Sequence, residues 1–251
     1  MRIFGSLSEL INETARELFS RGIVRYDLTR QGKVAPEPAK ELLGYVYRLT
    51  GYDDKDQFFA LAREITGRDF HRKEIAEAWF QDMISKRCSN PQPHWFMHPD
   101  LEAYYYKYCR DPVFNGESYT YCERIHWQVD IAIKLLLENP ERRAAVIGVW
   151  DPLYDVPKIG KHRVPCSMFY QFLAIREVDR YRLDMIYVQR SCDFVWFFPF
   201  DVYRAVRLLE YVTDELNRRD VEDRRWAPGN LVHFIGSLHA FESDVPERWK
   251  W

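Results

Sequence analysis

The chain has 251 residues, of which 47% are hydrophobic, so it is long enough to bury a core without disulfides or metal ions as supports. Its 36 basic and 38 acidic residues give a net charge of -2, which argues against nucleic acid or another polyanion as a partner. The sequence contains no internal repeat, low-complexity segment or Gly/Ser linker. We therefore expect one domain that spans residues 1–251.

The cysteines are scattered, at positions 88, 109, 122, 166 and 192, and form no C-x-x-C pair. This odd set predicts neither a disulfide framework nor a zinc or other metal site, and it favours a reducing, cytoplasmic setting. Charged residues follow the first few positions, and no long uncharged apolar run occurs in the sequence. We therefore expect neither secretion nor a membrane-spanning helix.

The predicted elements of the first half are mainly helices. Ser6 and Glu9 form a capping-box pattern, and the apolar period that follows predicts a helix that ends near Gly22. Residues 23–30 alternate in part, and further helices are predicted over residues 39–49, 58–65 and 71–83. Residues 87–116 are rich in Pro, His, Tyr and Trp without a clean period, which indicates a long, partly ordered insertion whose aromatic residues serve packing.

The second half mixes strands and helices. The helical period predicts a helix over residues 125–137 that ends at Asn139-Pro140, and a core helix over residues 202–216 with a wide apolar stripe. Residues 144–150 read as a buried strand, and residues 164–176, 182–190 and 229–241 as three more strands. This mixture predicts an α+β fold.

The stretch from Arg163 to Asp201 holds the candidate site. Cys166 lies among apolar residues, and a lone cysteine in such company is usually inert core material. Arg190 favours the other interpretation, because a guanidinium close to the sulfur would stabilise the thiolate that attacks carbon. Both interpretations stay open on the residues alone.

Several ordered motifs resemble those of the thymidylate synthase family, including its pyrimidine nucleotide hydroxymethylase branch. These motifs are Pro165-Cys166 with Gln171-Phe172, Gln189-Arg190-Ser191-Cys192-Asp193, Pro199-Phe200-Asp201 and Gly236-Ser237-Leu238-His239. Weaker matches are Asn139-Pro140-Glu141-Arg142-Arg143 with Trp150-Asp151-Pro152, and Glu77-Ala78-Trp79-Phe80. The resemblance covers most of the chain from residue 77 onward. It implies a single α+β domain with a central mixed sheet flanked by helices, and a homodimer whose sheets pack back to back.

The resemblance also implies catalytic roles. Cys166 resembles the nucleophile that adds to C6 of the pyrimidine, and Glu77 resembles the carboxylate that organises water and proton transfer. Tyr119 is similar to the tyrosine beside the C5 proton, although Thr120 follows it instead of glycine. Asp193 looks like the aspartate of the folate and base pocket. The implied cofactor is 5,10-methylenetetrahydrofolate.

The implied substrate is a nucleoside monophosphate. Arg190 and Ser191 resemble phosphate ligands from the same subunit, whereas Arg142 and Arg143 resemble the pair that reaches the phosphate across the dimer interface. Arg30 resembles the phosphate arginine of a mobile loop, without its usual glycine-rich surroundings. Gln189 and His239, in two of the ordered motifs, are also assigned to substrate binding.

Asp201 bears on the choice of base. Uracil enzymes of the family have asparagine at the matching position, and asparagine both donates and accepts, whereas an ionised aspartate only accepts. Cytosine offers an N4 amino donor, and a protonated N3 would add a second, charge-assisted bond. Asp201 therefore favours cytosine. Aspartate is also a preferred N-cap, so Asp201 could cap a helix that begins near Val202, and both roles can hold together.

Two departures from the family pattern affect the sugar and the cofactor. Phe241 replaces a tyrosine whose hydroxyl would meet the sugar 3′ oxygen, which favours CMP over dCMP. Phe197 stands where the family has a glycine beside the folate ring, so either the pterin is held differently or folate is not the cofactor.

The leading hypothesis is C5 hydroxymethylation of CMP through a Cys166–C6 adduct, completed by water. The alternatives are a pyrimidine nucleotide C5 methylase, a non-catalytic nucleotide-binding homologue, and a chain whose motifs record ancestry only.

Overall fold

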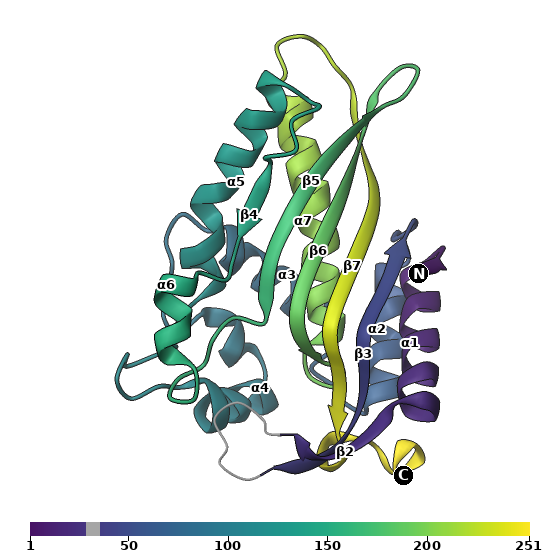
Figure 1. The fold of residues 1–251 in the computed structure, drawn as a ribbon, viewed down its shortest axis with the longest axis vertical. Helices are drawn as coiled ribbons and strands as arrows, with labels where there is room; N and C mark the ends of the chain where they lie inside the picture. Colours follow the sequence, from purple (N-terminus) through teal and green to yellow (C-terminus); the bar gives the residue numbers. More distant parts are fainter. Residues whose placement is uncertain (29–35) are drawn as a thin grey trace.

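The computed structural model describes residues 1–28 and 36–251, and the strands in these two ranges form one seven-stranded mixed sheet (Figure 1). The strand order is β1-β3-β7-β6-β5-β4, and β2 pairs with the outer edge of β3. The pairs β1–β3 and β6–β7 are parallel and the other neighbours are antiparallel. The strands are β1 (Arg2–Phe4), β2 (Ile23–Leu28), β3 (Glu37–Leu49), β4 (Val146–Gly148), β5 (Ser167–Arg176), β6 (Tyr181–Asp193) and β7 (Trp226–Phe241).

In Figure 1, α7 lies behind the long strands and packs along β6 and β7, while α5 and α6 lie to the left of these strands and α1 to the right. The α-helices are α1 (Leu7–Arg21), α2 (Lys55–Thr66), α3 (Lys73–Ile84), α4 (Pro99–Tyr104), α5 (Tyr121–Glu138), α6 (Pro152–Asp155) and α7 (Phe198–Arg219). Short 3₁₀ and π turns are η1 (Pro93–Met97), η2 (Tyr105–Cys109), η3 (Val156–Lys158), η4 (Glu242–Asp244) and η5 (Glu247–Trp249). Of the helices in the described ranges, none combines the length and apolar character needed to cross a membrane.

The two faces of the sheet differ in burial. On β6, Met185 and Tyr187 are fully buried toward the helices, while the alternating residues Ile186 and Val188 stay partly exposed on the other face. On β7, Phe234 lies on that second face with 40% of its surface exposed. The sheet therefore buries one face in the core and presents a partly apolar second face.

The predicted fold class, a mixed sheet flanked by helices, is confirmed, and so are the helices that correspond to α1, α2, α3, α5 and α7. The predicted helix over residues 39–49 is wrong, because these residues belong to β3. Leu42, Val46 and Leu49 satisfy a helical spacing, but burial follows a period of two: Tyr45 and Tyr47 are buried. Pairing with β7 along the length of β3 outweighs the local helical pattern.

The strand predicted over residues 144–150 is shorter and less buried than expected. It reduces to β4 at the sheet edge, where Ile147 is buried and Val146 is exposed. The helix predicted to begin near Val202 begins earlier, at Phe198, with Phe197 as its N-cap residue. Asp201 therefore lies inside the first turn, and its expected capping role is wrong.

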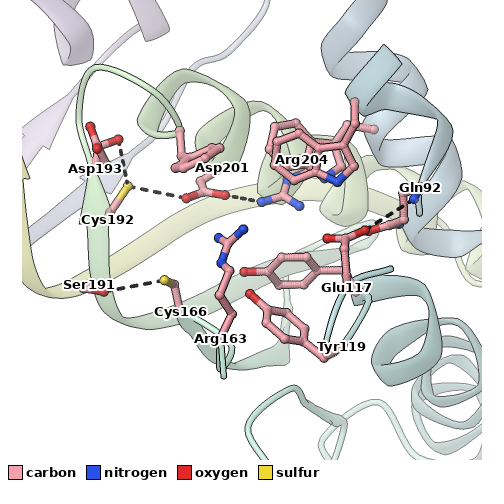
Figure 2. Close-up of a pocket in the computed structure, with 14 residues that line it drawn as sticks. Gln92, Glu117, Tyr119, Arg163, Cys166, Ser191, Cys192, Asp193, Asp201 and Arg204 are labelled. Atoms are coloured by element: carbon pink, nitrogen blue, oxygen red, sulfur yellow. Dashed lines mark hydrogen bonds and ion pairs between the residues drawn. The ribbon is translucent and has the colours of Figure 1, made fainter. Parts of the chain in front are cut away.

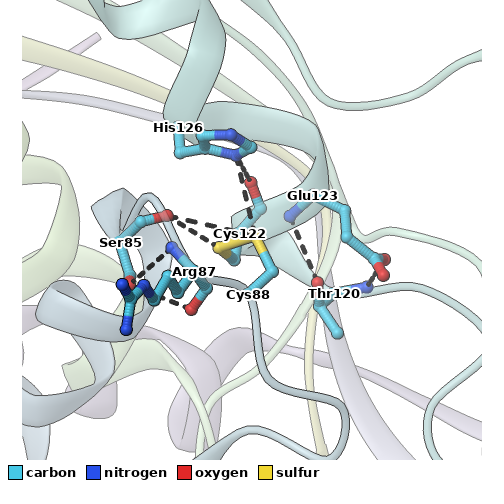
Figure 3. Close-up of a disulfide and its surroundings, with 7 residues drawn as sticks. All are labelled: Ser85, Arg87, Cys88, Thr120, Cys122, Glu123 and His126. Carbon is cyan, nitrogen blue, oxygen red and sulfur yellow. Dashed lines mark hydrogen bonds between the residues drawn. A yellow bond between two sulfur atoms is a disulfide. The ribbon is translucent and has the colours of Figure 1, made fainter.

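The segment expected to be a partly ordered insertion, residues 87–116, instead folds into η1, α4 and η2, with Trp95, Tyr104 and Tyr105 buried. A disulfide joins Cys88, near the start of this segment, to Cys122 in the first turn of α5 (Figure 3). The prediction of a chain without disulfides is therefore wrong. The pair is 34 residues apart in sequence and becomes adjacent only because α3 packs against α5.

His126 lies beside this disulfide, and its ligand atom and the two sulfurs lie within 4.8 Å of one another. A zinc site needs cysteines as thiolates, and disulfide-bonded sulfurs are not thiolates. The described arrangement is therefore a covalent bridge.

Candidate active site

A cavity lies where the end of β6, the first turn of α7, α3 and the segment before α5 meet (Figure 2). Its walls combine aromatic rings with charged and sulfur-containing side chains. The lining residues are Trp79, Gln92, Trp95, Glu117, Tyr119, Tyr121, Arg163, Cys166, Ser191, Cys192, Asp193, Phe197, Asp201 and Arg204. The structure thus brings five of the predicted site residues together: Cys166, Ser191, Asp193, Asp201 and Tyr119.

Cys166 immediately precedes β5, and its sulfur is close to two groups from β6. Ser191 Oγ donates to Sγ at 3.6 Å, and Arg190 Nη2 lies 3.8 Å from Sγ. Arg190 Nε also donates to the carbonyl oxygen of Pro165 at 2.9 Å, which ties the guanidinium to the loop before the cysteine. An attacking sulfur is an anion, and Arg190 supplies a positive charge beside it.

Asp193 ends β6 and shapes the turn into α7. Its Oδ1 accepts from the backbone N–H groups of Val195 and Trp196 at 3.0 and 3.2 Å. Its backbone carbonyl accepts from Phe197 N at 2.9 Å. Asp193 therefore holds the turn that presents Phe197 and Asp201 to the cavity.

Asp201 is held by a buried hydrogen-bond network. Gln189 Nε2 donates to Asp201 Oδ2 at 2.9 Å, and Gln189 Oε1 lies 2.8 Å from His233 Nε2. Burial lowers the pKa of His233 to about 3, so the imidazole is neutral. Its Nε2–H then donates to Gln189, and its Nδ1 accepts from Tyr47 OH at 2.8 Å. The network fixes the carboxylate of Asp201 in one orientation.

Arg204 is the partner that the sequence analysis missed. Its Nη2 forms an ion pair with Asp201 Oδ1, one turn away on α7, and only 1% of Arg204 is exposed. Its guanidinium lies over the rings of Trp79 and Tyr121, at 4.5 and 4.7 Å from their centroids. Within the described ranges, Arg204 Nε and Nη1 have no hydrogen-bond partner, so this side chain has donors to offer a ligand. The signal in the sequence was the pairing of opposite charges at Asp201 and Arg204, three residues apart on the apolar stripe of α7.

Glu117 is a second lining residue that the sequence analysis did not single out. It lies two positions before Tyr119, and 9% of its surface is exposed. Burial raises the pKa of Glu117 to about 7, although the charge of Arg163 and the N–H of Gln92 act in the opposite direction. Burial also raises the pKa of Tyr119, which keeps its hydroxyl neutral. The signal for Glu117 was its position in the sequence, two residues before Tyr119.

Glu77 does not line this cavity among the described residues. Its carboxylate accepts from Tyr203 OH at 2.8 Å and from Arg207 Nε at 2.9 Å. Burial alone would raise the pKa of Glu77, but the hydrogen bonds from Arg207, Gln81 and Tyr203 outweigh it and lower the pKa to about 2. The structure therefore places Glu77 in an ion-pair network between α3 and α7.

The remaining predicted ligands lie elsewhere. Arg142 and Arg143 are exposed on the turn between α5 and β4, where Arg142 Nη1 is 3.3 Å from Glu138. His239 lies on β7 beside Asp193, and its ring meets Phe241 edge-on. Arg30 lies outside the described residues.

The chain is similar in sequence to several known proteins. A family model described as thymidylate synthase matches residues 40–248. A putative thymidylate synthase of Methanosarcina barkeri is 30% identical over 143 residues, which are 53% of this chain and 59% of that protein. A thymidylate synthase of Rhizobium rhizogenes is 29% identical over 128 residues, 49% of this chain and 40% of that protein. A putative thymidylate synthase of Methanococcoides burtonii is 29% identical over 160 residues, 61% of this chain and 67% of that protein.

The fold and the cavity define an α/β protein in which a cysteine before one strand meets acidic and basic groups at the end of the next. The family model covers residues 40–248, which include every lining residue of the cavity, most of β3 and the strands β4 to β7. The chain belongs to the thymidylate synthase family. Its alignments with the Methanosarcina and Rhizobium relatives span less than two thirds of those proteins.

Proposed function

We propose that the protein transfers a one-carbon unit to C5 of a pyrimidine nucleoside monophosphate, and that its reaction is C5 hydroxymethylation of CMP. The observation that carries the proposal is the meeting of Cys166, Ser191 and Asp201 in one cavity. Cys166 is the nucleophile that adds to C6, which makes C5 electron-rich. Arg190 and Ser191 bind the phosphate, Tyr119 lies beside C5, and Asp193 holds the turn of the base and folate pocket.

The base is recognised by Asp201 together with Arg204. Each carboxylate oxygen has two acceptor sites, so Asp201 can accept an N4–H of cytosine while it keeps its bonds to Arg204 and Gln189. The donors of Arg204 then serve N3, which makes a protonated N3 unnecessary. A carboxylate next to a guanidinium matches the donor and acceptor of the cytosine edge. Phe241, which offers no hydroxyl to the sugar, supports CMP over dCMP.

Methylenetetrahydrofolate, when bound, supplies a one-carbon unit at the oxidation level of formaldehyde. The chemistry of the cavity walls suits such a flat heteroaromatic group in two respects: the walls include the rings of Trp79, Trp95 and Phe197, and Gln92 Nε2 and Trp79 Nε1 are buried donors without a partner in the described ranges. Phe197 narrows the pocket, since its ring lies edge-on to Trp79, Trp95 and Tyr104, with centroids 5.9, 6.3 and 5.3 Å away. A bound pterin would therefore contact the ring of Phe197.

The net reaction consumes CMP, methylenetetrahydrofolate and water, and yields 5-hydroxymethyl-CMP and tetrahydrofolate. A methylase would instead reduce the transferred carbon by hydride, so the product mass separates the two reactions. We also propose a homodimer that uses the partly exposed face of the sheet, with Arg142 and Arg143 reaching the partner's phosphate site. The partly exposed Ile186, Val188 and Phe234 support this use of the face.

Release of tritium from C5 of CMP, dCMP, UMP and dUMP, each with and without methylenetetrahydrofolate, tests the proposal. Folate-dependent release from CMP is the expected result, because attack by C5 must displace that hydrogen. Release from the uridine nucleotides alone would contradict the base assignment. Binding of CMP without release under any condition would instead support a non-catalytic nucleotide-binding protein, a function that the narrowing by Phe197 favours.

A further inference from the structure

The cavity contains a carboxyl group whose position suits proton transfer. Glu117 lines the same cavity as Cys166 and Tyr119, on the segment that leads into α5 (Figure 2). The side chain labelled Glu117 lies on the wall that carries Tyr119, opposite Asp201 and Asp193. Nine-tenths of Glu117 is buried, so it exchanges protons with a ligand in the cavity more readily than with bulk water.

The backbone of Glu117 is clamped. Asn90 Oδ1 accepts from Glu117 N at 2.6 Å, and Asn90 Nδ2 donates to Glu117 O at 2.9 Å. Gly116 permits this approach, because a Cβ there would lie 2.3 Å from Asn90 Oδ1. The N–H of Gln92 also points to Oε2 at 3.3 Å. The carboxyl group is therefore held in a defined place before any ligand binds.

Both protonation states of Glu117 are populated near neutral pH, because its pKa is about 7. A group with such a pKa can both give and take a proton, whereas Glu77, with a pKa of about 2, stays ionised. Several titratable or charged groups face Glu117 from the packed elements. They are Arg163, Glu123, Tyr105, Cys109 and Tyr119.

We propose that Glu117 is the catalytic acid and base at C5 of the pyrimidine, an inference that rests on the proposed function. When the thiolate of Cys166 bonds to C6, the electron pair of C5=C6 moves to C5 and takes the proton of the Glu117 carboxyl. In the reverse direction the Glu117 carboxylate removes a proton from C5. The C5–H pair then re-forms C5=C6, and Cys166 leaves as the thiolate. This exchange of the C5 hydrogen with solvent needs no further reactant.

Exchange at C5 provides the test. Tritium release from [5-³H]CMP is measured for wild type, Glu117→Gln, Glu117→Asp, Glu77→Gln and the exposed matched control Glu74→Gln. The comparison uses the condition, without or with methylenetetrahydrofolate, in which the wild type releases tritium. Affinity for CMP is measured by calorimetry, and folding by thermal melting. We expect Glu117→Gln to slow release by about 100-fold or more, Glu117→Asp to restore part of it, and CMP affinity to change by less than about threefold.

The pH profile adds a second readout. Wild-type release should show an inflection near pH 7 that Glu117→Gln lacks, whereas a merely structural role for Glu117 would lower the rate without removing the inflection. Release by Glu117→Gln within about threefold of wild type overturns the proposal and leaves the proposed function intact. Loss of release in Glu77→Gln alone overturns it in favour of Glu77. A wild type that neither binds CMP nor releases tritium from any of the four nucleotides refutes the proposed function, and this proposal with it.

Discussion

Arg204 carries a positive charge in the core, and among the described residues Asp201 forms the ion pair with it. Replacing Asp201 by Asn would leave that charge buried without compensation, which typically costs about 3–5 kcal/mol. We therefore predict that Asp201→Asn strongly lowers the free energy of unfolding in urea titrations. The double variant Asp201→Asn/Arg204→Gln should regain much of the loss. Equal stabilities of the single and double variants would contradict the coupling.

Glu117 should make stability fall as pH rises. Its pKa is raised from 4.5 in the unfolded chain to about 7, so the folded state binds more protons between these values. The stabilisation is complete below about pH 4.5 and is lost as pH rises through about 7, with an upper size of about 3 kcal/mol. Glu117→Gln lacks this titration. The difference in unfolding free energy between wild type and Glu117→Gln, measured from pH 4.5 to 8, should therefore be smaller at pH 4.5 than at pH 8.

Buried histidines make stability rise with pH, opposite to the effect of Glu117. Comparing wild type with Glu117→Gln cancels this histidine contribution. Burial lowers the pKa of His71 to about 3 and that of His94 to about 4, so their contribution to stability is lost as pH falls below 6.5. Both are retained in Glu117→Gln, and Glu74→Gln serves as a surface control. A difference between wild type and Glu117→Gln that does not change with pH would contradict the assigned titration.

The chemistry of single residues could be predicted only where a motif surrounds them. Cys166, Ser191, Asp193 and Asp201 stand in ordered motifs, and the structure gathers them. Arg204 stands in no such motif, and Glu117 is only close to Tyr119 in sequence. Their importance comes from burial beside the cavity, which depends on how α7 packs against α3 and on how the segment before α5 folds back. Glu77 was assigned because Glu77-Ala78-Trp79-Phe80 resembles a family motif, but the direction in which its side chain points depends on how α3 packs in the folded chain.

At the scale of elements, the junction of β6 and α7 limits the cavity, whose volume is about 40 Å³. Phe197→Gly removes the benzyl group from this junction. Because Phe197 is only partly buried, the loss of stability should be smaller than the about 3–5 kcal/mol typical of a buried phenylalanine. We predict tighter binding of methylenetetrahydrofolate in calorimetric titrations. Phe198→Ala, in the core, should destabilise without that gain, and unchanged folate affinity in Phe197→Gly would contradict the narrowing by Phe197.

The strand β3 is the long element whose type was predicted wrongly. The segment 39–49 offered a local helical spacing, and its strand β3 exists because β7, about 190 residues later, pairs with it. In contrast, α1 and α7 carry caps or apolar stripes that act locally, and both were predicted. The strands predicted over residues 164–176, 182–190 and 229–241 are also present, as β5, β6 and β7. The local pattern therefore failed only where it matched a helical spacing, as in β3.

At the scale of the whole molecule, the proposed dimer makes each site depend on two chains. Mixing Cys166→Ser subunits with Arg142→Ala/Arg143→Ala subunits forms heterodimers in which one site combines an intact cysteine with intact arginines. Random exchange in a symmetric dimer makes about half of the dimers mixed, so about a quarter of wild-type activity should return. Tritium release after subunit exchange measures it. No recovery, with heterodimers verified by mass spectrometry, would contradict the shared site.

The bridge between Cys88 and Cys122 has a consequence for the unfolded chain. It closes a loop of 34 residues. In the chain-entropy model, the lower conformational entropy of the closed unfolded chain raises the free energy of the unfolded state by about 4 kcal/mol at 25 °C. That loop carries the lining residues Gln92, Trp95, Glu117 and Tyr119. The disulfide therefore constrains this side of the cavity covalently, whereas no disulfide in the described ranges constrains the side built by β6 and α7. Cys88→Ser should therefore lower the melting temperature and raise hydrogen exchange first in this loop. The redox state of Cys88 and Cys122 would then control how rigid this wall of the cavity is, without any change at Cys166.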